Sequence, residues 1–125
     1  MGKQILVIDD EELLIKSFSR LLEKAGYDVY TVKNGVDAIV ATQEEDFDLI
    51  ISDVRMPGEN GVQTIREIQN LRLDNGKAAI PTIFITGFAD DEVEKEAKTL
   101  NPVAYLYKPF DTIHFLKMVS SAISK

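Results

Sequence analysis

The chain has 125 residues, with 14 Lys and Arg against 21 Asp and Glu and a formal net charge of -7. This length suits one domain spanning residues 1–125, large enough to bury about two-thirds of its extended surface. The absence of cysteine excludes a disulfide framework, a thiolate metal site and a cysteine nucleophile. The acidic balance argues against direct binding to nucleic acid or to a membrane surface. No apolar run approaches a membrane span and no signal peptide is recognisable, so we expect a cytoplasmic protein.

Two kinds of apolar periodicity alternate along the chain. Short runs rich in β-branched residues predict five strands, at residues 5–8, 27–32, 49–52, 82–86 and 103–107. After each run, apolar residues recur at helical spacing and predict a helix, the first of which ends at the C-cap signal Gly26. Residues 73–77 predict a surface turn before the fourth strand. Strands that alternate with single helices imply a parallel sheet covered on both faces, so we expect a three-layer α/β sandwich.

Polar and charged residues stand where the predicted strands end. They are Asp9 and Asp10 after the first strand, Asp53 at the end of the third, Thr86 and Gly87 at the fourth, and Lys108 after the fifth. Each has an ordinary explanation by itself, such as a helix N-cap, a turn former or a solvated lysine. Ligands of open α/β sheets, however, bind beyond the carboxyl ends of the strands. The shared position therefore predicts that these side chains converge on one rim.

Such a cluster has a definite chemistry. Carboxylates suit Mg²⁺, which takes one or two of them together with waters and a phosphate oxygen. A carboxylate beside a divalent cation and a lysine can attack phosphorus and form an aspartyl phosphate. Lys108 would neutralise the transferred phosphoryl group, and the Thr86 hydroxyl would donate a hydrogen bond to it. The residues thus predict phosphoryl acceptance on Asp53.

Four segments together resemble the receiver domains of two-component response regulators, chemotaxis regulators among them. They are residues 7–11 (Val-Ile-Asp-Asp-Glu), residues 53–58 (Asp-Val-Arg-Met-Pro-Gly) with Asn60-Gly61, residues 85–87 (Ile-Thr-Gly) and residues 105–110 (Tyr-Leu-Tyr-Lys-Pro-Phe). The resemblance covers essentially the whole chain. It implies a flavodoxin-like three-layer sandwich, with five helices around a five-stranded parallel sheet of order 2-1-3-4-5.

The resemblance also implies a role for each site residue. Asp53 is the phosphoacceptor. The Mg²⁺ ligands are Asp53 and Asp10 directly, Asp9 through water and Arg55 through its backbone carbonyl. Thr86 and Tyr105 form the switch, and Lys108 pairs with the phosphoryl group. Mn²⁺ is an alternative ion. The bond between Lys108 and Pro109 would be cis. Glu59 departs from the apolar residue usual in the family, so we expect the loop after Asp53 to be less firmly anchored.

The positions of Arg55 and Phe88 tune self-dephosphorylation in related receivers. Here Phe88 offers bulk without a hydrogen bond to orient water, and Arg55 can lie across the approach to the phosphoryl group. We therefore expect a phosphoryl group that lasts minutes to hours. The alternative is that both side chains point into solvent and leave the path open.

The function implied by the resemblance is a phosphorylation-activated signalling switch. A phosphohistidine on a sensor histidine kinase or a histidine phosphotransfer protein would be the Mg²⁺-dependent donor, and phosphorylation would change the partner-binding surface. The chain would not be an enzyme beyond its own phosphorylation and slow self-dephosphorylation. The sequence identifies neither the output domain nor the target protein. It leaves open whether phosphorylation produces a homodimer. It also leaves open whether the chain is a stand-alone regulator or a fragment of a larger protein.

Three other functions fit the residues less well. A flavodoxin-type electron carrier needs a hydroxyl-rich phosphate loop after the first strand, where this chain has four acidic residues at 9–12. A phosphatase of the haloacid dehalogenase type needs an Asp-x-Asp motif and a lid, whereas Asp9 and Asp10 are adjacent. A degenerate receiver that only binds partners would lack some of the chemical positions, and all of them are filled here.

Overall fold

The structure, a computed structural model, describes residues 2–123. Its parallel strands are β1 (Gln4–Ile8), β2 (Asp28–Val32), β3 (Leu49–Asp53), β6 (Thr82–Thr86) and β7 (Ala104–Tyr107). Its helices are α1 (Glu12–Lys24), α2 (Gly35–Glu44), α3 (Gly61–Asp74), α4 (Asp91–Lys98) and α5 (Thr112–Ile123). The strands pair in the order β2-β1-β3-β6-β7, every pair in parallel. The predicted fold class and strand order are confirmed.

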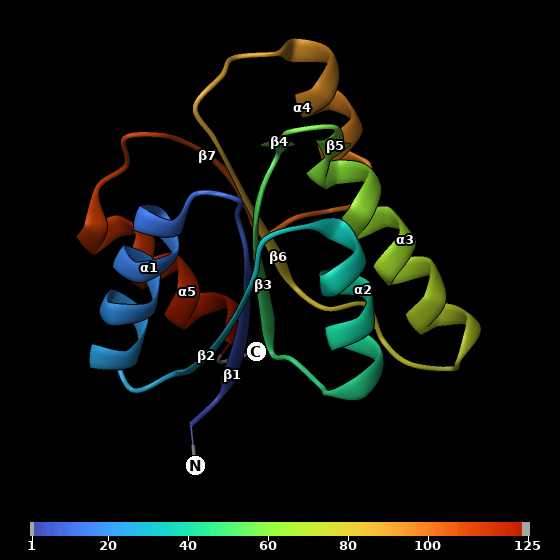
Figure 1. Cartoon of the computed structure of the whole chain (residues 1–125), viewed down its shortest axis with the longest axis horizontal. Coiled ribbons are helices and arrows are strands. Elements are labelled where there is room, and N and C mark those ends of the chain that lie inside the picture. Colours follow the sequence, from blue (N-terminus) through green and yellow to red (C-terminus); the bar gives the residue numbers. More distant parts are fainter. Residues whose placement is uncertain (1, 124–125) are drawn as a thin grey trace.

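The sheet lies between two layers of helices. Figure 1 shows it edge-on, with α1 and α5 on one side and α2 and α3 on the other. Alternate residues of one strand enter different cores because successive side chains point to opposite faces. Thus Ile5 joins Phe18 and Phe115 in the core under α1 and α5, while Leu6 joins Ile65 in the core under α2 and α3. Burial on both faces explains why β1 and β3 are apolar runs.

Two local features differ from the sequence prediction. The turn was expected from residue 73, but helix α3 continues to Asp74. The chain then turns at Asn75 and Gly76, and Gly76 has a φ of 72°. A short antiparallel hairpin, β4 (Arg55–Met56) and β5 (Glu59–Asn60), stands between β3 and α3. Strands of two residues are too short to leave a period-2 pattern in the sequence.

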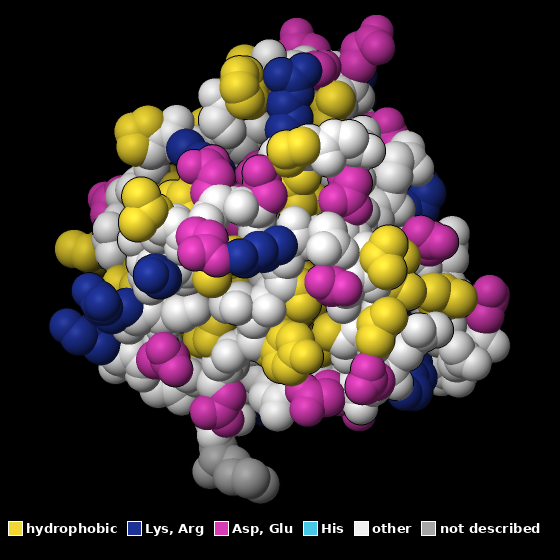
Figure 2. Space-filling view, viewed as in Figure 1, with side chains coloured by type: hydrophobic (Ala, Val, Ile, Leu, Met, Phe, Trp, Pro, Cys, Tyr) yellow, Lys and Arg dark blue, Asp and Glu magenta, His cyan; other side chains and the backbone are white. Residues whose placement is uncertain are grey.

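The surface mixes charged and hydrophobic side chains. On the face seen in Figure 2, acidic and basic side chains are interspersed with small hydrophobic patches. Among residues 2–123, no helix combines the length and apolar character needed to cross a membrane.

Candidate functional site

The acidic residues singled out in the sequence meet at one rim of the sheet. Asp9 and Asp10 follow β1, and Asp53 is the last residue of β3. Because these neighbouring strands run parallel, their carboxyl ends open at the same edge. One carboxylate oxygen from each of the three residues lies within 4.8 Å of the others. Three hard oxygen donors at this spacing suit a divalent cation such as Mg²⁺.

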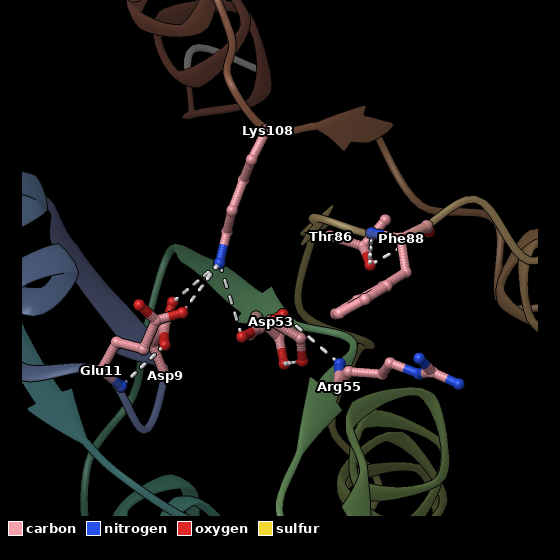
Figure 3. Close-up of polar contacts among 8 residues, drawn as sticks. Asp9, Glu11, Asp53, Arg55, Thr86, Phe88 and Lys108 are labelled. Atoms are coloured by element: carbon pink, nitrogen blue, oxygen red, sulfur yellow. Dashed lines mark hydrogen bonds and ion pairs between the residues drawn. The ribbon is translucent and has the colours of Figure 1, made fainter.

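Lys108 follows strand β7, and its side chain extends toward this cluster, as Figure 3 shows. Its Nζ lies 3.5 Å from Oδ2 of Asp53 and 3.6 Å from Oδ2 of Asp9. A third and more exposed partner is Glu11, whose Oε1 is 3.9 Å away. The peptide bond between Lys108 and Pro109 is cis, as the sequence predicted. One ammonium group therefore faces two buried carboxylates and one exposed carboxylate.

The burial of the two carboxylates shapes their electrostatics. The side chains of Asp9 and Asp53 are only 3% and 5% exposed. Loss of hydration and the nearby negative charge of Asp9 raise the pKa of Asp53 to about 6, although Lys108 opposes the shift. Burial likewise raises the pKa of Asp9 above its usual range. A cation bound among these groups would favour their ionised forms.

Backbone N–H groups hold the carboxylates of Asp9 and Asp53 in place. The N–H of Glu11 donates to Oδ1 of Asp9 at 2.9 Å, and the N–H of Arg55 donates to Oδ1 of Asp53 at 3.3 Å. The start of α3 also presses against the Asp53 backbone, since a Cβ at Gly61 would lie 2.0 Å from the Asp53 carbonyl oxygen. Only glycine allows this close approach. Asp53 is thus held in place from both its side chain and its main chain.

The hydroxyl of Thr86 is engaged within its own loop. It donates to the carbonyl of Phe88 at 3.3 Å and accepts from the Phe88 N–H at 3.1 Å. Tyr105, the predicted switch partner, lies half-buried on the adjacent strand β7 and packs against Phe84 and Tyr107. Among the described residues its hydroxyl has no hydrogen-bond partner although it is buried. The structure brings the two switch candidates onto neighbouring strands without a bond between their hydroxyls.

Arg55 and Phe88 contact each other beside the Asp53 carboxylate. The guanidinium carbon of Arg55 lies 4.7 Å from the centre of the Phe88 ring, within the range of a cation–π interaction. In Figure 3 the Phe88 ring extends from the Thr86 side of the site toward Asp53. Both side chains remain exposed at the rim, with Phe88 57% exposed. Their predicted effect on phosphoryl lifetime stays a prediction.

A contact near the site ties the β4–β5 hairpin to helix α2. Glu59 in the β4–β5 hairpin accepts a hydrogen bond of 2.7 Å from the N–H of Gly35, the first residue of α2. This polar contact holds the loop after Asp53 to α2, and the expectation that the loop is less firmly anchored than in the family stays a prediction. Only the unusual residue type at position 59 could have signalled such a bond.

Comparison with known proteins defines the class of the molecule. Residues 5–120 match the family of response regulator receiver domains. The chain is 36% identical over 111 residues to the transcriptional regulatory protein CrdR of Helicobacter pylori, a match that covers 89% of this chain and 50% of CrdR. The chain thus spans half the length of that relative.

Two solved structures show the same fold. The chemotaxis protein CheY4 of Vibrio cholerae is 29% identical with a TM-score of 0.85, over 98% of this chain and 99% of that one. A response regulator protein from Burkholderia pseudomallei with a phosphorylated aspartic acid, calcium ion and citrate is 27% identical with a TM-score of 0.82, over 98% of this chain and 69% of that one. The chain belongs to the response regulator receiver family, whose general function is phosphorylation-dependent signalling.

Proposed function

We propose that this chain is a signalling switch that accepts a phosphoryl group on Asp53. The observation that carries the proposal is the pairing of a buried carboxylate at the end of the central strand with the Lys108 ammonium, 3.5 Å away. Asp9 and Asp10 add the oxygen donors that a divalent cation needs. The Burkholderia pseudomallei relative, with its phosphorylated aspartic acid and calcium ion, supports the same chemistry here.

The transfer needs only one nucleophile on this chain. A carboxylate oxygen of Asp53 attacks the phosphorus of a phosphohistidine, and a P–O bond forms as the P–N bond breaks. The imidazole leaves with the electron pair of the broken bond and takes up a proton. Lys108 pairs with the phosphoryl oxygens and neutralises part of their charge. Because the chain is itself the acceptor, we infer that it is not an enzyme beyond its own phosphorylation and slow dephosphorylation.

The acidic cluster would hold the metal ion of this reaction. We assign Asp10 and Asp53 as direct ligands, Asp9 as a ligand through water and the backbone carbonyl of Arg55 as the last ligand from the protein. Bound Mg²⁺, or Mn²⁺ in its place, would screen the negative charge of the incoming phosphoryl group. Asp53 could then stay ionised despite its burial.

The donor in this proposal is a phosphohistidine on a sensor histidine kinase or a histidine phosphotransfer protein. An apolar groove beside the site supports this partner. It runs between α1 and the start of α5 and is lined by Leu14, Ser17, Phe18, Leu21, Lys108, Pro109, Phe110 and Thr112. Lys108 lines the groove and also pairs with Asp53, so a donor helix seated there would present its histidine to the acceptor.

The output of the switch would pass through Thr86 and Tyr105. On phosphorylation the Thr86 hydroxyl would leave the Phe88 backbone and donate to the phosphoryl group. The Tyr105 ring could then change its rotamer, because its hydroxyl has no hydrogen bond to lose among the described residues. The exposed surface of α4 and β7 would change, and a target protein or a second copy of the chain would read the change.

Mass spectrometry tests the acceptor directly. Incubation with acetyl phosphate and Mg²⁺ should add one phosphoryl group to the chain, and hydroxylamine should remove it, as expected of an acyl phosphate. The Asp53→Asn variant keeps the size of the side chain and removes the nucleophile. Labelling that persists in this variant would overturn the assignment.

A further inference from the structure

The contact between Glu59 and Gly35 joins two segments that lie 24 positions apart in the sequence. Oε1 of Glu59 accepts the Gly35 N–H at 2.7 Å, at the first turn of α2. That N–H has no partner within its own helix, and the helix dipole favours a negative charge at this end. Both effects hold the Glu59 carboxylate in place.

The packing around this contact leaves little room for a side chain at position 35. A Cβ at position 35 would lie 2.6 Å from Oγ1 of Thr64 and 2.7 Å from Oε1 of Glu59. A side chain there would make the Glu59 carboxylate or the Thr64 hydroxyl shift. Glycine at position 35 thus lets the Glu59 carboxylate reach the helix end without such a shift.

The hairpin that carries Glu59 needs such an anchor. Each of its strands has two residues, and Glu59 is paired with Met56 across the hairpin. An isolated two-stranded hairpin is marginally stable at best. Met56 is buried in the core and anchors β4, whereas Glu59 anchors β5 through α2. The hairpin is therefore held on both strands.

The same hairpin presents Arg55 to the phosphoryl-acceptor site. The Arg55 N–H donates to Oδ1 of Asp53 at 3.3 Å, and the Arg55 carbonyl is the ligand assigned above to the metal ion. Arg55 is paired with Asn60, the neighbour of Glu59 on β5. A shift of β5 would therefore move the Arg55 backbone relative to Asp53.

We infer that Glu59 is a positioning residue, which ties the hairpin to the first turn of α2 and so presets the Arg55 backbone for metal binding beside Asp53. The inference rests on the proposed function, because it assigns a purpose to the Arg55 carbonyl. It goes beyond that function in placing part of the metal site's geometry under the control of α2.

The test compares three variants of the unphosphorylated chain. Glu59→Ala removes the contact, and Glu59→Gln keeps an oxygen that can accept from Gly35. Asn34→Ala is the matched control, because Asn34 caps the same helix through the Asp37 N–H and bonds to no residue of the hairpin. Isothermal titration with MgCl₂ gives the metal affinity, and hydrogen exchange gives the opening of the hairpin at the Arg55 and Gly61 amides.

We expect Glu59→Ala to weaken Mg²⁺ binding by about tenfold, as removal of a group that supports a ligand does. Faster exchange at the Arg55 amide should accompany the loss. Glu59→Gln should keep most of the Mg²⁺ affinity and most of the exchange protection at the Arg55 amide. Asn34→Ala should lower the melting temperature without changing the affinity or the exchange. If Asn34→Ala weakened binding as much as Glu59→Ala, helix stability alone would explain the effect and the inference would fall.

Failure of the inference can be told apart from failure of the proposed function. The positioning role alone is overturned under two conditions together. The wild-type chain binds Mg²⁺ and takes up phosphate on Asp53, and the Glu59→Ala variant has the same Mg²⁺ affinity and the same amide exchange rates. A wild-type chain that takes up no phosphate on Asp53 overturns the function, and the positioning role with it.

Discussion

Nζ of Lys108 lies 3.5 Å from Oδ2 of Asp53, close enough for strong attraction but longer than a typical hydrogen bond. The same ammonium is 3.6 Å from Asp9, so it compensates two buried carboxylates with a single charge. Without a metal the cluster keeps an excess of negative charge in a place that water hardly reaches. This imbalance makes the site receptive to a cation and costly to the metal-free fold.

The first prediction is that Lys108→Met destabilises the metal-free chain. The substitution leaves Asp9 and Asp53 buried without a counter-charge, and breaking a buried ion pair in this way costs on the order of 3–5 kcal/mol. Urea denaturation at pH 8 with a chelator measures the loss. Lys33→Met is the control, because its ion pair with Glu12 is exposed on both sides and contributes little. An equal effect of the two substitutions would contradict the compensation described here.

The second prediction concerns the pH dependence of stability. The pKa of Asp53 is raised from 3.8 to about 6 in the folded chain, so between these values the folded state binds more protons than the unfolded state. Stability from this group therefore falls as pH rises through that window and is constant above it. Asp53→Asn removes the effect. We expect its stability gain over wild type to grow from near zero at low pH to about 3 kcal/mol above pH 7.

Denaturation of both proteins in chelator, from pH 4 to pH 8, checks this expectation. Other carboxyls with lowered pKa values, such as those of Glu12 and Glu94, change stability in the opposite direction. Because both proteins contain them, the comparison cancels their contributions. A stability difference that does not vary with pH would show that Asp53 is not disfavoured in its ionised form.

The fold and the rim of the site were predictable because both follow from local patterns. Short runs rich in β-branched residues and helical spacing predicted the order of elements, and parallel pairing then brought Asp9, Asp53 and Lys108 to one edge. The tie from Glu59 to Gly35 was not predictable, since it depends on how closely α2 and the hairpin approach in three dimensions. The same holds for the stacking of Arg55 on Phe88, which joins strand β4 to the loop after β6 with no shared sequence signal.

The third prediction concerns the switch. Thr86→Ala should still accept phosphate, because Asp53, Lys108 and the acidic cluster are unchanged. It should fail to change the Tyr105 rotamer, because no hydroxyl remains to leave the Phe88 backbone and bind the phosphoryl group. The coupling is a shift between two populated states, so a partial loss is expected. Fluorine NMR of chains labelled with 3-fluorotyrosine would follow the Tyr105 signal before and after phosphorylation. A wild-type response in the variant would exclude Thr86 from the switch.

The last prediction is that the phosphoryl group on Asp53 persists for minutes to hours. Hydrolysis needs a water in line with the Asp53 oxygen that departs from phosphorus, and neither Phe88 nor Arg55 offers an amide or carboxylate to orient it. The Phe88 ring reaches toward Asp53, and the Arg55 guanidinium, 4.7 Å from the ring centre, holds the ring in that position. We therefore expect the two side chains together to hinder the approach of water.

Arg55→Asn and Phe88→Ala should each speed the decay of the phosphorylated chain in Mg²⁺. A cation–π contact at an exposed site is worth about 0.5–1 kcal/mol, so its loss should raise the rate by roughly two- to fivefold. Because the side chains act through one contact, the double variant should decay little faster than the faster single variant. Phe88→Leu is the control, since it keeps bulk but loses the aromatic face, and its decay rate should fall between those of wild type and Phe88→Ala. Single substitutions that leave the decay rate unchanged, or slow it, would reject shielding by Arg55 and Phe88.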